Sequence, residues 1–165
     1  MRILGIDPGT VRTGWGIVDV SGSRITGVEA GVVCPKRDDA LHDRLRAIYE
    51  GLSEVVARYH PTVAAVEDLF HAKHAAAALK LGHARGVALL AAANANLDVF
   101  AYPPAVVKRT VAGRGRAEKV QVARFVGLML GWKEQHAMDA TDALAVAITH
   151  AQRHRVARSG LNGRS

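Results

Sequence analysis

The sequence predicts an α/β fold in which a mixed five-stranded sheet carries helices on both of its faces. The first part of the chain contains three strand-like stretches joined by tight turns, which is typical of a meander. The stretches that follow alternate between helix and strand, and this combination builds a mixed sheet covered by helices. The length of 165 residues fits one domain, because domains cluster at roughly 100–200 residues.

Strands are expected at five places. Residues 2–6 form a short apolar run that stops at an Asp-Pro-Gly turn, a sequence that ends a strand. Residues 11–20 and 24–33 carry β-branched side chains on either side of a Ser-Gly-Ser turn and complete the meander. Residues 62–66 form a mostly apolar run that ends at an acidic pair, and residues 97–101 are closed by a Tyr-Pro-Pro sequence.

Helices are expected where apolar side chains recur every three or four residues. These segments are residues 38–59, 71–94, 105–111, 117–130 and 138–155. Asp38 or Asp39 would cap the first, since Asp is favoured at N-caps. The helix at 71–94 is alanine-rich and apolar around most of its circumference, so it should be buried on more than one side. The second covering surface is either another helix of the same chain or a second protomer.

Positive charge is concentrated in the last third of the chain. The net charge is +7, and residues 1–107 contain 11 Lys and Arg against 11 Asp and Glu, whereas residues 108–165 contain 11 against 4. A basic segment beside a neutral one favours a polyanionic partner, most simply nucleic acid. The alternatives are a solubility role or a basic tail, and we expect residues 157–165 to form a disordered basic tail.

Composition excludes several classes of protein. The chain is 49% hydrophobic and 22% charged, which excludes wholesale disorder, and no apolar run is long enough to cross a bilayer. Cys34 is the single cysteine, so internal disulfides and cysteine-rich metal fingers are excluded and a reducing, cytoplasmic setting is expected. We expect Cys34 itself to be a small buried hydrophobe. Only 5% of residues are aromatic, which disfavours a single-strand binder that relies on stacking.

Four acidic residues stand out by their positions. Asp7 follows the first strand and Glu67 the fourth, so both lie at the carboxyl ends of strands. Asp139 and Asp142 open the last helix three residues apart, which puts them on one face of its first turn. Four converging carboxylates would repel one another unless cations lay between them. Oxygen ligands suit Mg²⁺ or Mn²⁺, and two such ions roughly 4 Å apart can promote hydrolysis of a phosphodiester.

Each of these acids also has a purely structural interpretation. Asp139 and Asp142 could cap their helix and interact with its dipole. Asp7 could form an Asx-turn before Pro-Gly, and Glu67 could be a solvated strand end. Taken singly, each residue fits the structural interpretation better, whereas the set of four fits a metal-dependent nuclease.

Five sequence blocks carry a specific resemblance. They are GIDPGTVRTGWG at 5–16, VEDLF at 66–70, ALKLGHARG at 78–86, AEKVQV at 117–122 and MDATDALAVA at 138–147. In order and spacing these blocks resemble the RuvC family of Holliday-junction resolvases. The resemblance implies a single nuclease domain with an RNase H-like fold over residues 1–156. It also implies a homodimer that cuts four-way DNA junctions symmetrically with Mg²⁺ or Mn²⁺, two ions per active site, alongside branch-migration proteins.

The resemblance further implies roles for individual residues. The catalytic, metal-binding set would be Asp7, Glu67, Asp139 and Asp142. Phe70 resembles an aromatic that wedges near the junction centre, although a core position at a strand end fits it equally. Lys108 and Lys119 resemble lysines that contact phosphates, and the alternative for Lys119 is a surface residue without a partner.

The loop Gly113-Arg114-Gly115-Arg116 is a further candidate for DNA binding. Arg114 and Arg116 could bind a phosphate together with the loop's backbone N–H groups, or the loop could be only a flexible connector.

From the acidic set, the basic segment and the resemblance together, we expect an endonuclease of branched DNA, acting in recombination and repair. Two alternatives are a related RNase H-like nuclease that acts on RNA and a non-catalytic module that binds branched DNA. An actin-like ATPase shares a similar first turn, but 165 residues leave no room for its second domain.

Overall fold

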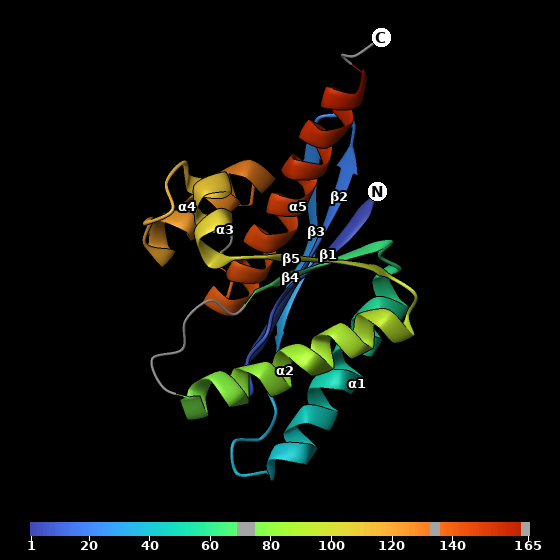
Figure 1. The fold of residues 1–165 in the computed structure, drawn as a ribbon, viewed down its shortest axis with the longest axis vertical. Helices are drawn as coiled ribbons and strands as arrows, with labels where there is room; N and C mark the ends of the chain where they lie inside the picture. The colour runs from blue at the N-terminus through green and yellow to red at the C-terminus, as the bar shows by residue number, and fades with distance from the viewer. Residues whose placement is uncertain (69–74, 133–135, 163–165) are drawn as a thin grey trace.

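The computed structural model describes residues 1–68, 75–132 and 136–162, with side chains as far as residue 154. It confirms the expected fold class, a five-stranded mixed sheet with helices on both faces (Figure 1). The strands are β1 (Arg2–Asp7), β2 (Thr13–Ser21), β3 (Arg24–Val33), β4 (Val63–Glu67) and β5 (Asp98–Tyr102). Each lies within a few residues of its expected position. In these described segments no helix is long and apolar enough to span a membrane.

The sheet order is β3-β2-β1-β4-β5, so β1 lies at the centre. It pairs antiparallel with β2, where Asp7 lies opposite Gly14, and parallel with β4, where Ile6 lies opposite Val66. The carboxyl ends of parallel neighbours meet at the same edge of a sheet. Asp7 and Glu67, the last residues of β1 and β4, therefore lie at one edge.

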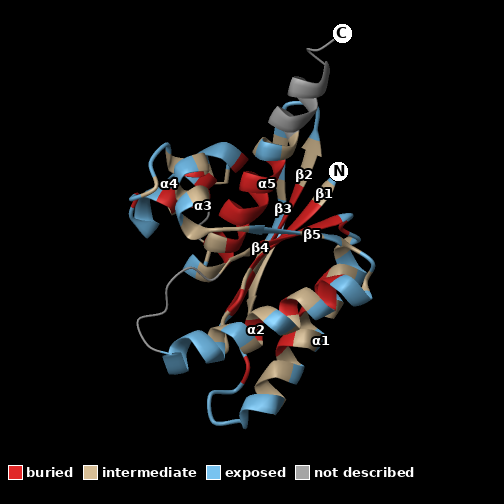
Figure 2. Ribbon diagram, in the orientation of Figure 1, coloured by how far each residue is buried: buried red, intermediate tan, exposed pale blue. Residues whose placement is uncertain are grey.

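Five helices cover the two faces of the sheet. They are α1 (Leu41–Tyr59), α2 (Ala75–Asn94), α3 (Pro104–Ala112), α4 (Lys119–Leu130) and α5 (Met138–Asn162). α1 and α2 pack together on one face, and α5 lies across the other with α3 and α4 outside it (Figure 1). The buried residues concentrate in the sheet and on the helix sides that face it (Figure 2).

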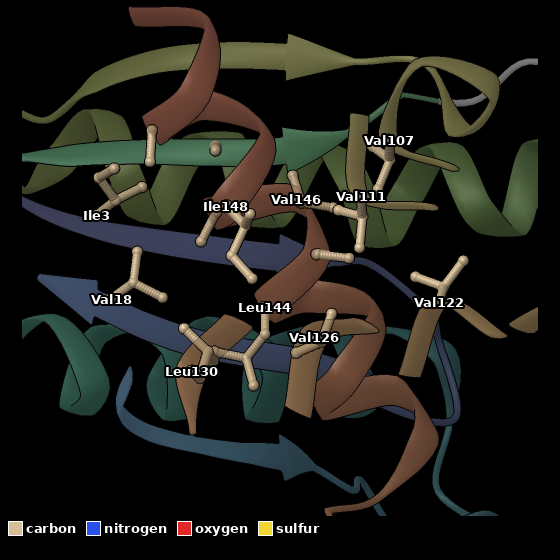
Figure 3. Close-up of a cluster of buried hydrophobic side chains, with 14 of the residues drawn as sticks. Ile3, Val18, Val107, Val111, Val122, Val126, Leu130, Leu144, Val146 and Ile148 are labelled. Atoms are coloured by element: carbon tan, nitrogen blue, oxygen red, sulfur yellow. The ribbon is translucent and has the colours of Figure 1, made fainter. Parts of the chain in front are cut away.

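Alternation along the central strands supplies both cores, since successive side chains of a strand point to opposite faces. Leu4 packs with Ile48 and Leu52 of α1. Ile3 belongs to the opposite cluster, which Leu144 and other α5 residues share with α3 and α4 (Figure 3). Ile3, Leu4, Ile48 and Leu52 are all fully buried. Two independent cores thus hold the sheet rigid between its helices.

α5 approaches the sheet unusually closely, and glycines make this possible. A Cβ added at Gly5 of β1 would overlap the backbone oxygen of Ala143, and one at Gly14 of β2 would overlap that of Asp139. Any side chain at these positions would push α5 away. The first turn of α5 is thereby held directly beside the end of β1.

Some expectations were wrong in detail. α1 begins after Ala40, so neither Asp38 nor Asp39 caps it. Cys34 is exposed rather than buried. α5 continues to Asn162, beyond the expected end at residue 155, and the expected tail at 157–165 stays a prediction.

The structure shows what covers one side of α2. Its buried residues are four alanines, Ala84, Ala88, Ala91 and Ala92, and they belong to the side that packs on α1 and the sheet. Within the chain another helix therefore covers one side of α2. The opposite side is open, with Leu79 64% and Leu90 53% exposed.

Candidate active site

Asp7 and Glu67 are hydrogen-bonded to each other at the shared edge of β1 and β4. This bond acts on the two groups in opposite directions, since it raises the pKa of Asp7 and counters part of the rise in the pKa of Glu67. Burial is the main cause that raises the pKa of Asp7 to about 8, and the negative charges of Glu67 and Asp142 add to it. Burial also raises the pKa of Glu67. Lys119 counters the rise for both carboxyls but does not cancel it.

Asp142 joins this pair from α5. Its side chain is 15% exposed, and Lys119 Nζ donates to its Oδ2 across 2.5 Å. Lys119 is the first residue of α4, whose start is fixed by a reciprocal capping box between Glu118 and Gln121. The interpretation of Lys119 as a surface residue without a partner is therefore wrong. The pKa of Lys119 is raised because its bond to Asp142, with help from Asp7 and Glu67, outweighs the cost of burying it.

Asp139 lies one turn earlier on α5 and has a different partner. Arg12, in the loop between β1 and β2, donates from Nε to Asp139 Oδ2 across 2.6 Å. The bond raises the pKa of the Arg12 guanidinium. The structure thus brings Asp7, Glu67 and Asp142 together, and it pairs Asp139 with Arg12.

A small cleft of about 140 Å³ opens beside these carboxyls. Glu67, Lys108, Lys119 and Asp142 line it, with apolar residues of α3, α4 and α5 behind them. Lys108 of α3 is close enough to counter part of the rise in the pKa of Glu67. The cleft therefore places acidic oxygens and two ammonium groups within one space, which is suited to a phosphate flanked by its neutralising cations.

The described residues contain no group of three His, Cys, Asp or Glu side chains already arranged around a metal position. Asp139 and Asp142 are instead neutralised by Arg12 and Lys119. The chemistry of the donors nevertheless fits a hard divalent cation, since all four are carboxylates and such ions prefer oxygen. A cation there would also favour the ionised form of Asp7, against the burial and the neighbouring negative charges that raise its pKa.

The residues expected to contact DNA lie in different parts of the structure. Lys108 and Lys119 line the cleft. Arg114 and Arg116 are exposed on the loop between α3 and α4 and lie outside the cleft lining. Phe70 lies outside the described residues.

Two features of the site were missed by sequence reasoning. Arg12 is contained in the first sequence block, but nothing local marks its partner, which is 127 positions away. Arg44 of α1 donates to the backbone oxygen of Thr10 and so braces the same loop. A basic residue in the turn after a strand-end acid is the only signal that could have pointed to Arg12.

Clustered carboxylates at the ends of two adjacent strands and on a facing helix, in a five-stranded mixed sheet, define the class of RNase H-like nucleases. Comparison with known proteins gives the family. A model of the family described as "Crossover junction endodeoxyribonuclease RuvC" matches residues 3–150. The chain belongs to this RuvC family of crossover junction endodeoxyribonucleases.

Individual relatives agree with this assignment. A crossover junction endodeoxyribonuclease RuvC of Syntrophotalea carbinolica is 54% identical over 151 residues, which cover 92% of this chain and 94% of that protein. A protein of the same name from Rhodopseudomonas palustris is 50% identical over 161 residues, or 98% and 92% of the two chains. The solved structure of T. thermophilus RuvC in complex with Holliday junction substrate has a TM-score of 0.89 and 37% identity, covering 95% of this chain and 96% of that one.

Proposed function

We propose that this protein is a structure-specific endonuclease that resolves Holliday junctions, by metal-dependent hydrolysis of phosphodiester bonds, in DNA recombination and repair. The observation that carries the proposal is the convergence of Asp7, Glu67 and Asp142 beside Lys119 and Lys108. Family membership supports it, as does the similarity to a RuvC structure described as a complex with Holliday junction substrate.

The catalytic set in this proposal is Asp7, Glu67, Asp139 and Asp142, which would hold Mg²⁺ or Mn²⁺, two ions per site. Such ions, when bound, activate water and stabilise the leaving oxygen of a phosphodiester. The residues themselves contribute position: the sheet fixes Asp7 and Glu67, and the close approach of α5 fixes Asp139 and Asp142.

The DNA would approach along the basic side of the cleft. Lys108 and Lys119, which line the cleft, would neutralise phosphates next to the bond that is cut, and the exposed Arg114 and Arg116 would supply further phosphate contacts. Phosphate contacts of this kind set affinity and register rather than sequence preference. Phe70 remains a candidate for the wedge at the junction centre because of its place in the second sequence block.

A homodimer is part of the proposal, since paired cuts on opposing strands need two symmetric sites. The open side of α2 supports it. Leu79, Gly82, Gly86 and Leu90 recur there at helical spacing and are all exposed in the single chain. Small residues between two leucines allow two helices to approach closely, and a symmetric pair of α2 helices would bury both leucines.

The cellular setting completes the proposal. The protein would act in the cytoplasm on four-way junction DNA, together with branch-migration proteins that move the junction.

The test is cleavage of a synthetic four-way junction, with linear duplex and RNA as control substrates, in Mg²⁺, in Mn²⁺ and in EDTA. The proposal predicts symmetric nicks that need a divalent ion and are confined to the junction. Cleavage of RNA in preference to the junction would favour the related RNA nuclease. Tight junction binding without cleavage in either metal would favour a binding module.

A further inference from the structure

Arg12 forms an ion pair with Asp139, one of the proposed metal ligands, while about half of the Arg12 side chain is exposed to solvent. Its Nε donates to Asp139 Oδ2 across 2.6 Å, and 47% of the Arg12 side chain is exposed, against 31% for Asp139. A guanidinium carries five N–H donors in a planar fork. The side of the fork away from Asp139 is therefore accessible to an incoming anion.

The loop that carries Arg12 is braced from both ends. Thr13 Oγ1 donates to the Gly9 backbone oxygen at 2.8 Å and accepts from the Gly9 N–H at 3.3 Å. Arg44 of α1 donates from Nε to the Thr10 backbone oxygen at 3.0 Å. These bonds hold the backbone on either side of Arg12. The fold therefore fixes the point from which the Arg12 side chain reaches Asp139.

We propose that Arg12 competes with the divalent cation for Asp139 and, once displaced, binds a phosphate of the DNA strand at the site. The inference rests on the proposed function, since it takes Asp139 as a metal ligand. Asp139 can bond fully to the guanidinium or to a cation, but two positive charges on one carboxylate repel each other. DNA would offer the displaced guanidinium a phosphate as a new acceptor, so phosphate binding and cation binding at this site favour each other. By linkage, each ligand then raises the affinity for the other by the same factor.

In this role Arg12 is a positioning residue that lowers the affinity of the free protein for the metal ion and raises its affinity for DNA. Arg12→Ala removes the competitor, so free protein should bind Mn²⁺ more tightly, by roughly two- to five-fold, the size of an exposed ion pair. With saturating Ca²⁺, the same variant should bind the junction more weakly. The slope of log affinity against log salt should then fall by roughly one phosphate contact. A purely structural residue would weaken both kinds of binding.

The experiment is calorimetric titration of Mn²⁺ into the full chain without DNA, followed by junction binding in Ca²⁺ at several salt concentrations. Arg58→Ala is the matched control, because it removes one exposed arginine from the last turn of α1, where the guanidinium lies over Tyr59. Arg12→Lys keeps the charge without the fork and should fall between wild type and Arg12→Ala in both measurements.

Two results would overturn the inference. One is Mn²⁺ affinity in Arg12→Ala that equals or falls below that of Arg58→Ala. The other is an unchanged salt slope for junction binding. If wild type binds Mn²⁺ and Asp7→Asn does not, the proposed metal site stands even when the Arg12 inference fails. Absence of Mn²⁺ binding in wild type would contradict both the proposed metal site and the Arg12 inference.

Discussion

A single methyl group added at Gly14 should move the acidic residues of α5 away from Asp7 of β1. A Cβ there would lie 1.9 Å from the Asp139 backbone oxygen and 2.4 Å from its carbonyl carbon. Real Cβ atoms stay at least 3.0 Å from such neighbours, so the first turn of α5 must retreat by about 1 Å, the difference between 3.0 and 1.9. β2 cannot yield easily, because Gly14 is paired with Asp7 of β1. The shift would therefore carry Asp139 and Asp142 away from Asp7.

The consequences of Gly14→Ala follow from that displacement. Overpacking of this kind costs about 1–3 kcal/mol of folding free energy, and a misplacement of about 1 Å in an active site can lower the rate on the order of 10²-fold. The assays are the nicking rate on a four-way junction and unfolding in urea. Gly127→Ala in α4 is the control, since a Cβ there would meet only an ordinary contact, 3.5 Å from the Trp132 backbone oxygen. Wild-type cleavage by Gly14→Ala would refute the claim that close approach of α5 builds the site.

Three further predictions concern charge and assembly. In EDTA the free energy of unfolding should fall as pH rises from about 4 to about 8, because the folded chain keeps a proton on Asp7 that the unfolded chain releases near its ordinary pKa. Asp7→Asn should flatten this dependence in urea midpoints, and a rise in stability over that range would contradict it. Charge reversal at Lys108 or Lys119 should weaken junction binding and lower its salt slope by roughly one phosphate contact, so an unchanged slope would count against phosphate contact. Leu90→Glu should give a monomer in sedimentation, whereas Leu128→Glu, at a leucine on α4 that is 68% exposed, should leave a dimer; two identical profiles would argue against α2 as the interface.

Much of the fold could be predicted because its signals are local. β-branched stretches, turn sequences and helical spacing mark the place of every strand and helix, although α5 continues from its expected end at residue 155 to Asn162. The exceptions have physical reasons. α1 starts at Leu41, because Ala40 rather than the preceding aspartates takes the N-cap position. Cys34 was expected to be buried from its residue type alone, but it follows the last residue of β3 and is exposed.

The site was predictable where position alone defines it. Asp7 and Glu67 terminate strands, and Asp139 and Asp142 open a helix, so their convergence follows once the topology is known. Their ion pairs do not follow. Arg12 is 127 positions from Asp139, and Lys119 is 23 positions from Asp142, and nothing in the local sequence pairs them.

The role of the glycines was hidden for a similar reason. Gly5 and Gly14 read as ordinary residues of β-strands. Only the packing of α5 shows that a side chain at either position would collide with its backbone.

Cleavage by wild type and Asp7→Asn, measured side by side on one labelled four-way junction in Mn²⁺, tests the central claim most directly. Asp7 lies where burial and both neighbouring acids act on one carboxyl, and Asn keeps its shape while removing the negative charge that a cation needs. The account predicts paired, symmetric nicks by wild type, and undiminished junction binding without nicks by Asp7→Asn. Cleavage by Asp7→Asn at the wild-type rate would contradict it.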